Sequence, residues 1–540
     1  MIKQAVLKTK EFLTKFAKKQ DKQNPPPSLQ NLDAGKFCNH SVFNKNSFLI
    51  VLFSTIAVKI IFAGILPITS DEAYFVLWGR HLDFGYYDHT PMIGWILYLM
   101  NFTGSSAFIM RLPAIAFSSV VGIGIYTVLK EDGGQKAFLI SSLYLLSPLN
   151  IFNILAVNDS PLFFFSFFSC FFLYLALKKE RLLYYALSGI LLGCAFLSKE
   201  IAVLLGFSYL LYFLFSQKSF QKTSGFALLF AAIFPFAALF IAYNYFHNWA
   251  NILFNVFNRN KEEVFEIYKP LAFILSSLYL LTPPIAFYLV KKRKTLMQSA
   301  FSKKDFSVFL FAFLFPLLFF ALISFKAVVG LHWLISFYPF MYILLPQFLS
   351  QSEIINSVKF TTFFSVAHIL IAFVVLSLPI SLIKNNPNYN LIAMSKYPQE
   401  LLRVLNSNEN NFVFAAPSYS DASILEFYSG KRTILFGKGS KYARQNDFWT
   451  DFKALNGKNI LIVRNSRPDA GEYQPFFDYI SEEEFYLKGA RFYFVKGYGF
   501  KYEVYKERIL SAIKEEFYKV PKYLPMPKKE KDKGFIGKYF

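Results

Sequence analysis

The sequence predicts an α-helical protein that crosses a membrane many times and ends in a small soluble α/β domain. Of its 540 residues, 54% are hydrophobic and 20% are aromatic, whereas soluble domains have about 45–50% apolar residues. Apolar runs of roughly 20 residues, the length that spans a bilayer, recur through the first two thirds of the chain. Beyond residue 385 they give way to short, strand-like segments.

The hydrophobic pattern predicts about 11–13 transmembrane helices, of which eleven can be located. They occupy residues 47–66, 107–129, 137–155, 162–177, 182–197, 201–215, 226–245, 271–290, 306–323, 334–348 and 360–383. We therefore expect a multi-span membrane domain over 47–384. The basic segment 1–46 precedes it and fits either a helix on an anionic membrane surface or a solvated tail. Residues 385–540 follow as a separate domain.

Basic residues are unevenly distributed between the loops on the two sides. If the N-terminus lies inside, the inner loops hold 14 Lys and Arg, and the outer connections hold six. Such an excess marks the cytoplasmic side. We therefore expect a multi-pass protein of the cytoplasmic (inner) membrane, with a cytoplasmic N-terminus and a periplasmic C-terminal domain. Because the net charge of +22 arises largely from these loops and the basic segment, nucleic acid is not the expected partner.

The C-terminal region has the pattern of a small α/β domain. The segments NFVFAA, RTILF, NILIV and RFYFV are typical of short strands, and DASILEFY between them is typical of a helix. Segments of this kind pack as a sheet covered by helices. The last segment, PKKEKDKGFIGKYF, is predicted to be a basic and poorly ordered end.

The predicted outer connections share a chemical character that the inner loops lack. They contain TSDEAYFVLWGRHLDFGYYDHTP (69–91), NDSP (158–161), SKE (198–200), NYFHNWANILFNVFNRNKEE (244–263) and KAVVGLHW (326–333). Acids, cations, histidines and aromatic residues therefore gather on one side of the membrane. A simple membrane anchor does not require this asymmetry, so we expect a functional site at the outer surface.

Asp71 and Glu72 directly follow the first span. Thr69 and Glu72 have the spacing of a capping box, in which two side chains satisfy the first free N–H groups of a helix. Capping explains Glu72 better than it explains Asp71. If the helix continues, Asp71 shares a face with Phe75 and Trp78, and a carboxylate then lies beside an aromatic wall. We therefore interpret Asp71 as a catalytic or binding residue and Glu72 mainly as the cap.

The other polar residues of these connections have structural interpretations as well, and only their shared side favours a site. The alternatives are a surface turn for Asp88 and His89, a helix cap for Asp159, an exposed ion pair between Lys199 and Glu200, and an exposed cation at Arg259.

The residues resemble a known family. The segment SDEAYFVLWGRHLDFGYYDHTPMIGW is similar to the first outer loop of bacterial membrane glycosyltransferases related to protein O-mannosyltransferases and to the lipid A aminoarabinose transferase. RLPAIAFS, NDSPLFFF, GCAFLSKEIAVLL, YNYFHNW, LLTPP and YSDASILEFYSGKRTILF resemble family segments in the same order. The resemblance covers most of residues 47–465. It implies a PMT-like GT-C fold, with many transmembrane helices and surface helices in the first outer loop.

The resemblance also implies roles for individual residues. Asp71 corresponds to the main catalytic carboxylate and Asp159 to a second acidic residue of the site. Asp88 and His89 fall where relatives hold an acid and a basic residue near the donor phosphate or a metal, so a divalent metal there is left open. Two positions depart from the family. His89 stands where the aminoarabinose transferases have Lys, and His332 where many relatives have Asn.

The implied donor is a polyprenyl-phosphate sugar, whose lipid tail stays in the bilayer. An acceptor oxygen attacks the anomeric carbon while the lipid phosphate leaves, and a single displacement inverts the anomeric centre. A carboxylate such as Asp71 can take the acceptor proton, and cations can stabilise the growing phosphate charge. The candidate phosphate ligands are His89, Lys199, Arg259 and Lys326, and the further site candidates are Glu72, Asp88, Asn244, His247 and His332.

Two other functions remain as alternatives. A transporter or lipid flippase places ionisable groups within its spans, where Arg111 and His368 are the few such groups that we note. A non-catalytic membrane receptor with an outer binding domain leaves the outer acids unexplained. For a glycosyltransferase, the acceptor is a lipid A-like lipid, another envelope glycan or a protein, with a lipid or glycan favoured by the resemblance to bacterial enzymes.

Overall fold

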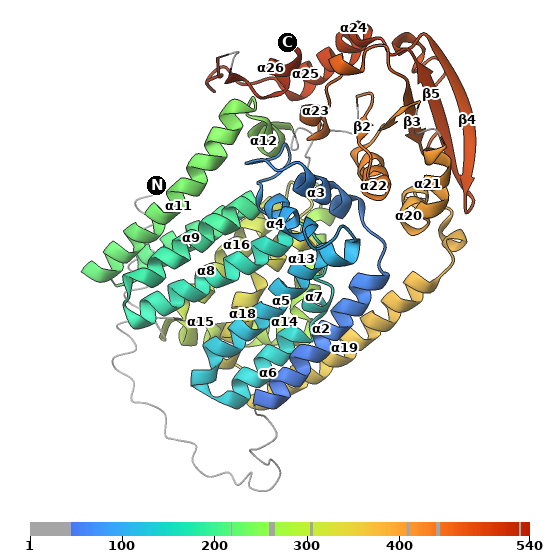
Figure 1. The fold of residues 1–540 in the computed structure, drawn as a ribbon. Helices are drawn as coiled ribbons and strands as arrows, with labels where there is room; N and C mark the ends of the chain where they lie inside the picture. Colours follow the sequence, from blue (N-terminus) through green and yellow to red (C-terminus); the bar gives the residue numbers. More distant parts are fainter. Residues whose placement is uncertain are drawn as a thin grey trace, which may run out of the picture. The chain divides into compact units, whose positions relative to one another are not determined.

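The computed structural model describes residues 45–217, 219–258, 265–302, 306–407, 411–438, 443–528 and 531–540. Residues from Phe43 onward form one compact unit. The predictions for the N-terminal 44 residues and for Arg259 fall outside the described residues. Within the compact unit, a bundle of helices is followed by a domain built around a five-stranded sheet (Figure 1). The helical fold with a small C-terminal sheet domain is therefore confirmed.

The helical bundle is formed by the first two thirds of the chain. Its first helices are α2 (Lys45–Ile65), α3 (Ser70–Arg80), α4 (Met92–Asn101), α5 (Ala107–Leu129), α6 (Gly134–Leu145), α7 (Pro148–Ile151), α8 (Asp159–Lys179), α9 (Leu182–Ser198), α10 (Val203–Phe215) and α11 (Phe220–Phe246). The later ones are α12 (Ala250–Ile252), α13 (Tyr268–Leu281), α14 (Pro283–Lys291), α15 (Arg293–Ser302), α16 (Ser307–Ile323), α17 (Leu331–Ile335), α18 (Tyr338–Leu344) and α19 (Gln351–Ser377).

Several of these helices can cross a membrane. In the described part of the chain, α2, α5, α8, α11 and α19 are each long and apolar enough to do so alone. The helices α9 and α16, and the segment Glu200–Phe215 that contains α10, are shorter apolar helices that coincide with expected spans. The chain is thus a multi-pass membrane protein. The short helices α3 and α4 of the first connection lie between the bundle and the sheet domain (Figure 1).

Three expected spans are interrupted in the structure. Residues 137–155 form α6 and α7, residues 334–348 contain the break between α17 and α18, and residues 271–290 form α13 and α14, which are bent by 104°. A proline begins the second helix at two of these breaks and follows its first residue at the third: Pro148, Pro283 and Pro339. Proline lacks an N–H and clashes with the preceding turn, so it favours a break in a helix, although α5, α11 and α16 each continue through one. Hydropathy alone does not predict these breaks.

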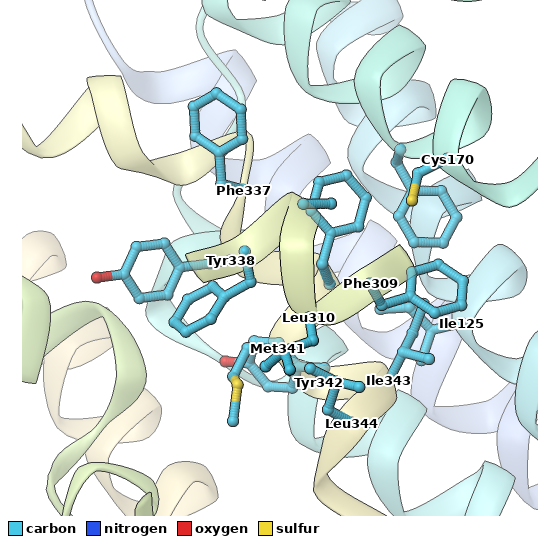
Figure 2. Close-up of a cluster of buried hydrophobic side chains, with 14 of the residues drawn as sticks. Ile125, Cys170, Phe309, Leu310, Phe337, Tyr338, Met341, Tyr342, Ile343 and Leu344 are labelled. Atoms are coloured by element: carbon cyan, nitrogen blue, oxygen red, sulfur yellow. The ribbon is translucent and has the colours of Figure 1, made fainter. Parts of the chain in front are cut away.

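Aromatic and aliphatic side chains fill the interior of the bundle. Figure 2 shows Ile125 of α5, Cys170 of α8 and Phe309 of α16 gathered around Met341 and Ile343 of α18, all of them buried. Such dense packing of helices leaves few places for charged groups, which are costly inside a bilayer.

Lys59 is a charged residue in the bundle that the sequence analysis overlooked. It lies fully buried on α2, so Arg111 and His368 are not the complete set of ionisable groups inside the spans. Its ammonium donates to Ser118 Oγ at 2.8 Å, to Asn150 Oδ1 at 2.8 Å and to Ser119 Oγ at 3.3 Å. Three neutral acceptors satisfy the three N–H bonds of the group, which accounts for its burial.

The C-terminal domain begins with α20 (Tyr389–Lys396) and α21 (Pro398–Asn406). It continues with β1 (Val413–Ala416), α22 (Tyr419–Ser429), β2 (Thr433–Leu435), α23 (Asn446–Trp449), β3 (Ile460–Arg464), β4 (Tyr479–Leu487), β5 (Ala490–Tyr498), α24 (Tyr502–Tyr505), α25 (Ser511–Phe517) and α26 (Phe535–Tyr539). The strand order is β2-β1-β3-β5-β4. β1 pairs in parallel with β2 and β3, whereas β3, β5 and β4 pair antiparallel.

Four of the five strands were predicted from their apolar runs, and β4 was not. β4 carries SEEE in its centre and is largely exposed, so it lacks the alternation that marks a half-buried strand. It pairs with β5 through the tight turn at Lys488 and Gly489, both of which have positive φ angles. Such two-residue turns match the twist of a hairpin.

The end of the chain is ordered, which corrects the expectation of a disordered tail for residues 531–540. Phe535 of α26 is fully buried in the core of the C-terminal domain. The carboxylate of Asp532 accepts from Asn248 Nδ2 at 2.9 Å, and Asn248 Oδ1 accepts from the backbone N–H of Ile536 at 3.0 Å. The prediction of disorder relied on the charged residues of this segment and did not consider the aromatic side chains that anchor it.

Candidate functional site

The site begins at α3, whose N-terminus has the predicted capping box. The Thr69 hydroxyl accepts from the backbone N–H of Glu72, and Glu72 Oε2 accepts from the backbone N–H of Thr69. Glu72 has a second role that the sequence did not reveal. Both its oxygens accept from the Arg111 guanidinium at 2.7 Å, and both side chains are buried. Glu72 also accepts from the N–H of Ala156 at 3.1 Å, so it joins α3 to α5 and to the segment before α8.

Asp71 lies on the exposed side of the same helix turn. Its Oδ1 accepts a hydrogen bond of 3.1 Å from the hydroxyl of Tyr419, the first residue of α22 in the C-terminal domain. Burial and the nearby Asp71 carboxylate raise the pKa of Tyr419 to about 12, so its hydroxyl stays protonated and donates. Phe75 and Trp78, the rings expected beside Asp71, are buried and pack edge to face with ring centroids 4.7 Å apart.

Asp88 is a buried residue, so it does not belong to a surface turn. Its carboxylate accepts from the Tyr74 hydroxyl at 2.9 Å and from the Arg444 guanidinium at 2.5 Å. The same guanidinium lies 4.1 Å from the centre of the Tyr419 ring. Burial lowers the pKa of Arg444, but the Asp88 carboxylate outweighs that effect and raises it, so the cation is permanent. The C-terminal domain thus contacts Asp71 and Asp88 of the first connection.

A second group of ionic residues lies at the N-terminal end of α8 and the C-terminal end of α9. Lys199 donates to Asp159 Oδ1 at 2.8 Å, and both side chains are largely buried. Glu200 faces His89, with 3.8 Å between Oε2 and Nδ1. The expected alternative of an exposed Lys199–Glu200 pair is therefore wrong, because each residue pairs with a different partner. The ring centre of His89 lies 6.3 Å from that of Phe75 and 6.5 Å from that of Trp78. His89 therefore packs against α3, the helix that carries Asp71.

Asn244 and His247 lie at the end of α11, where they hold the following loop. Asn244 Oδ1 accepts from the backbone N–H of Ile252 at 3.1 Å. His247 stacks on Tyr243 with ring centroids 4.1 Å apart, and burial lowers the pKa of its imidazole. Farther along this loop, Asn255 donates to the backbone carbonyl of Asp88 at 3.0 Å. Asn244 and His247 therefore shape the loop that supports Asp88.

Lys326 and His332 lie on the segment around α17. The backbone carbonyl of Lys326 accepts from Lys269 Nζ at 3.0 Å, and its own side chain is exposed. His332 is also exposed and lies beside Gly330 and Trp333. These contacts tie the segment to α13, and the role of both residues as phosphate or sugar ligands stays a prediction. Within the described residues, no group of three or more His, Cys, Asp or Glu side chains converges as metal ligands.

An apolar cavity of about 360 Å³ opens between α9, α10 and α11. Its lining is entirely hydrophobic and includes Phe196, Ala202, Gly206, Phe207 and Phe230. Phe196 precedes Lys199 by three residues and Ala202 follows Glu200 by two. The cavity and the ionic group therefore share the connection between α9 and α10.

Sequence reasoning did not find Tyr419 and Arg444 as site residues. They lie 348 and 356 positions from their partners Asp71 and Asp88, and no local spacing signals such contacts. The one available signal was the family-like segment YSDASILEFYSGKR, which begins with Tyr419, and Arg444 lies outside it.

Comparisons with known proteins agree with this architecture. Residues 88–241 match the family model described as dolichyl-phosphate-mannose-protein mannosyltransferase. The fold is similar to the crystal structure of ArnT from Cupriavidus metallidurans bound to undecaprenyl phosphate, with 14% identity, a TM-score of 0.59, and coverage of 84% of this chain and 98% of that chain. The same ArnT in the apo state matches with 14% identity and a TM-score of 0.56, and the match covers 83% of this chain and 97% of that chain. A sequence search of curated proteins gives no match.

The family match over residues 88–241 and the shared fold agree with the resemblance of the sequence to PMT-like GT-C membrane glycosyltransferases. The family resemblance of the sequence is thereby confirmed. At 14% identity, the similarity to the solved structures shows a shared fold and does not identify the substrate.

Proposed function

We propose that the protein transfers a sugar from a polyprenyl-phosphate donor to an envelope acceptor at the outer face of the cytoplasmic membrane. One observation supports Asp71 as the main catalytic carboxylate. Glu72, Asp88 and Asp159 each have a cationic partner, at 2.7, 2.5 and 2.8 Å. Among these four acids, Asp71 alone has no cation against it in the described part of the chain, and it is exposed. It is therefore the acid whose oxygen is available to accept a proton.

The reaction is a single displacement. The acceptor oxygen attacks the anomeric carbon, the bond from that carbon to the phosphate oxygen breaks, and the configuration inverts. Asp71 takes the proton of the acceptor hydroxyl, a role that typically contributes about 10²–10⁴ in rate. Tyr419 positions the Asp71 carboxylate through its 3.1 Å hydrogen bond. A phosphate acceptor would arrive already ionised, and Asp71 would then chiefly position the sugar.

The leaving phosphate binds where cations lie near the membrane surface. Lys199 is the best placed of the candidates, because it is largely buried at the end of α9 with Asp159 as its partner. Charge-assisted hydrogen bonds are stronger where water is scarce. His89 lies on the same side, facing Glu200. Lys326 and Arg259 remain further candidates for this role.

The cavity between α9, α10 and α11 suits the lipid tail of the donor. Its hydrophobic lining matches a polyprenyl chain, and two of its lining residues, Phe196 and Ala202, each lie three positions from Lys199 in the sequence. A donor bound in this way has its tail in the bilayer and its phosphate at Lys199. The structural match covers 98% of the ArnT chain, and that ArnT structure is bound to undecaprenyl phosphate. This similarity supports a lipid-phosphate donor for the present protein as well.

The charge asymmetry of the loops supports the orientation, with the N-terminus in the cytoplasm and the site and residues 385–540 in the periplasm. The acceptor is a lipid A-like lipid, another glycan or a protein. A transporter would place its ionisable site within the spans. Lys59 lies within a span but is held by neutral acceptors, whereas Asp71, Asp159 and Lys199 lie at helix ends.

The test is sugar transfer by the purified protein in lipid nanodiscs. Undecaprenyl phosphates that carry hexoses or pentoses are offered with a lipid A-like lipid, a glycan or a protein, and release of undecaprenyl phosphate is measured. We expect acceptor-dependent release with at least one donor. Movement of labelled lipid across liposome membranes, without release of undecaprenyl phosphate, would instead indicate a flippase.

A further inference from the structure

Four buried side-chain atoms have no hydrogen-bond partner among the described residues and belong to the His89–Glu200 contact or to chain neighbours of Asp159 and His89. They are His89 Nδ1, Thr90 Oγ1, Asn158 Nδ2 and Glu200 Oε1. Thr90 is 1% exposed and Asn158 3% exposed, so bulk water does not reach them freely. Buried polar atoms in folded proteins are nearly always paired. These four atoms therefore leave hydrogen-bonding capacity for a polar ligand.

The distance between His89 and Glu200 fits a bridging hydroxyl group. Nδ1 and Oε2 lie 3.8 Å apart, which is too long for a direct hydrogen bond. An oxygen atom can lie at about 2.8 Å from both, the usual length of such bonds. A hydroxyl group both donates and accepts, so it can donate to the Glu200 carboxylate and accept from the imidazole.

Asn158 and Thr90 supply further polar atoms that their local structure does not use. Asn158 occupies the N-cap position of α8, where Asn commonly accepts a backbone N–H. Here its side chain makes no capping hydrogen bond, and Nδ2 is unpaired. Thr90, between His89 and Pro91, likewise leaves its hydroxyl unused. These two side chains add an N–H donor and a hydroxyl to the group.

We propose that His89, Thr90, Asn158 and Glu200 form a subsite that binds hydroxyl groups of the donor sugar. This proposal rests on the proposed function and specifies which part of the donor each group contacts. Lys199 binds the phosphate, and the four residues bind hydroxyl groups of the sugar, so His89, a candidate phosphate ligand above, is assigned to the sugar. The subsite would thus determine which sugar the enzyme transfers.

The chemistry of the group favours a sugar over a second phosphate. Glu200 presents an unpaired carboxylate oxygen, which would repel an anion at that point. Donors and an anionic acceptor side by side match a polyol, whose hydroxyl groups form both kinds of hydrogen bond. A site built to pair such groups also rejects analogues that lack them, because its buried atoms then stay unpaired.

Equilibrium binding to two lipids tests the proposal. The probes are bare undecaprenyl phosphate and the sugar-loaded undecaprenyl phosphate that the wild-type protein uses best. Glu200→Gln and Thr90→Val preserve size and remove one interaction each. We expect each to weaken binding of the loaded lipid about tenfold and to leave the affinity for the bare lipid within about twofold. Lys199→Met should weaken both lipids alike, and Thr90→Ser should recover binding of the loaded lipid.

A deoxy-sugar donor identifies the hydroxyl group that is read. In the wild-type protein, removal of the contacted hydroxyl should weaken binding about as much as Glu200→Gln does. The two changes together should cost little more than either one, because they delete the same interaction.

Two results would reject the subsite while leaving the proposed function intact. In the first, the wild-type protein turns over the sugar-loaded lipid, but each variant loses as much affinity for the bare lipid as for the loaded lipid. In the second, the wild-type protein turns over the sugar-loaded lipid, and neither variant changes its affinity for either lipid. If the wild-type protein turns over no sugar-loaded lipid with any acceptor, the proposed function itself fails, and the subsite fails with it.

Discussion

The hydroxyl of Tyr419 donates a hydrogen bond of 3.1 Å to Asp71, although the two residues are 348 positions apart in the sequence. One belongs to the first connection of the membrane bundle and the other to the C-terminal domain. Arg444 reinforces this junction, since its guanidinium contacts Asp88 and stacks on the Tyr419 ring. The C-terminal domain is therefore part of the site and not merely attached to the bundle.

Replacing Tyr419 by Phe should lower kcat while leaving KM for the donor unchanged. The variant removes only the hydroxyl that holds the Asp71 carboxylate. A hydrogen bond to a charged group contributes about 1.5–3 kcal/mol, so we expect kcat to fall about tenfold or more. Steady-state kinetics with saturating acceptor measures both constants.

Tyr428→Phe is the matched control for this variant. Tyr428 lies on the same helix, α22, and its hydroxyl donates to the Ser395 carbonyl at 2.9 Å, away from Asp71. Equal losses of kcat in both variants would mean that α22 is merely destabilised.

Removing Arg444 should destabilise the protein, because Asp88 would remain buried without its cation. Breaking such a pair costs about 3–5 kcal/mol. We expect Arg444→Gln to lower the melting temperature clearly, and Asp88→Asn with Arg444→Gln to recover part of the loss. Arg464→Gln is the control, because its partner Glu472 is one-third exposed. Thermal unfolding in detergent that showed no difference between Arg444→Gln and Arg464→Gln would contradict the anchoring role of the pair.

Asp447 should make stability depend on pH. Burial raises the pKa of its carboxyl to about 7 from an ordinary 3.8. Between these values the folded protein holds a proton that the unfolded chain has lost, so stability falls as pH rises through this window. Asp447→Asn removes the titration, and its stability advantage should grow from about pH 5 to about pH 7.5 and then level off. Melting temperatures across this range that run parallel for both proteins would refute the assignment.

Filling the apolar cavity should impair long-chain donors selectively. Gly206 lines it, and a side chain added there meets only Leu192, at 3.7 Å from the new Cβ. Gly206→Leu therefore extends into the space that we assign to the prenyl tail. Since each buried CH₂ group contributes about 0.8 kcal/mol, KM for an undecaprenyl donor should rise about tenfold, and KM for a two-isoprene donor should not.

Gly64→Leu provides the comparison for that substitution. Gly64 lies on α2, where a side chain meets nothing within 4 Å, and it lies outside the cavity. The lipid-tail assignment would be wrong if both glycine variants responded equally to donor chain length.

The sequence predicted those features that local patterns encode. Hydropathy located α5 to the residue, and residue spacing located the capping box of Thr69 and Glu72. Hydropathy ran through the breaks at Pro148, Pro283 and Pro339, because apolar residues continue on both sides.

Contacts between distant segments had no local signal. Arg111 binds Glu72 across 39 positions, which turns the expected cap into a buried ion pair as well. Nothing in SKE distinguishes an exposed Lys199–Glu200 pair from two separate pairs with Asp159 and His89. Such choices depend on how helix ends meet in space.

The most direct test of the account is single-turnover sugar transfer by Asp71→Asn with saturating lipid donor. Glu72→Gln is unsuitable as its control, because it would disturb the buried Arg111. Asp71→Glu serves instead, since it retains a carboxylate. With an acceptor hydroxyl, we predict that Asp71→Asn binds donor normally, melts at the wild-type temperature and transfers about 10²–10⁴ times more slowly, while Asp71→Glu recovers part of the rate. Transfer by Asp71→Asn at the wild-type rate would contradict the catalytic role of Asp71.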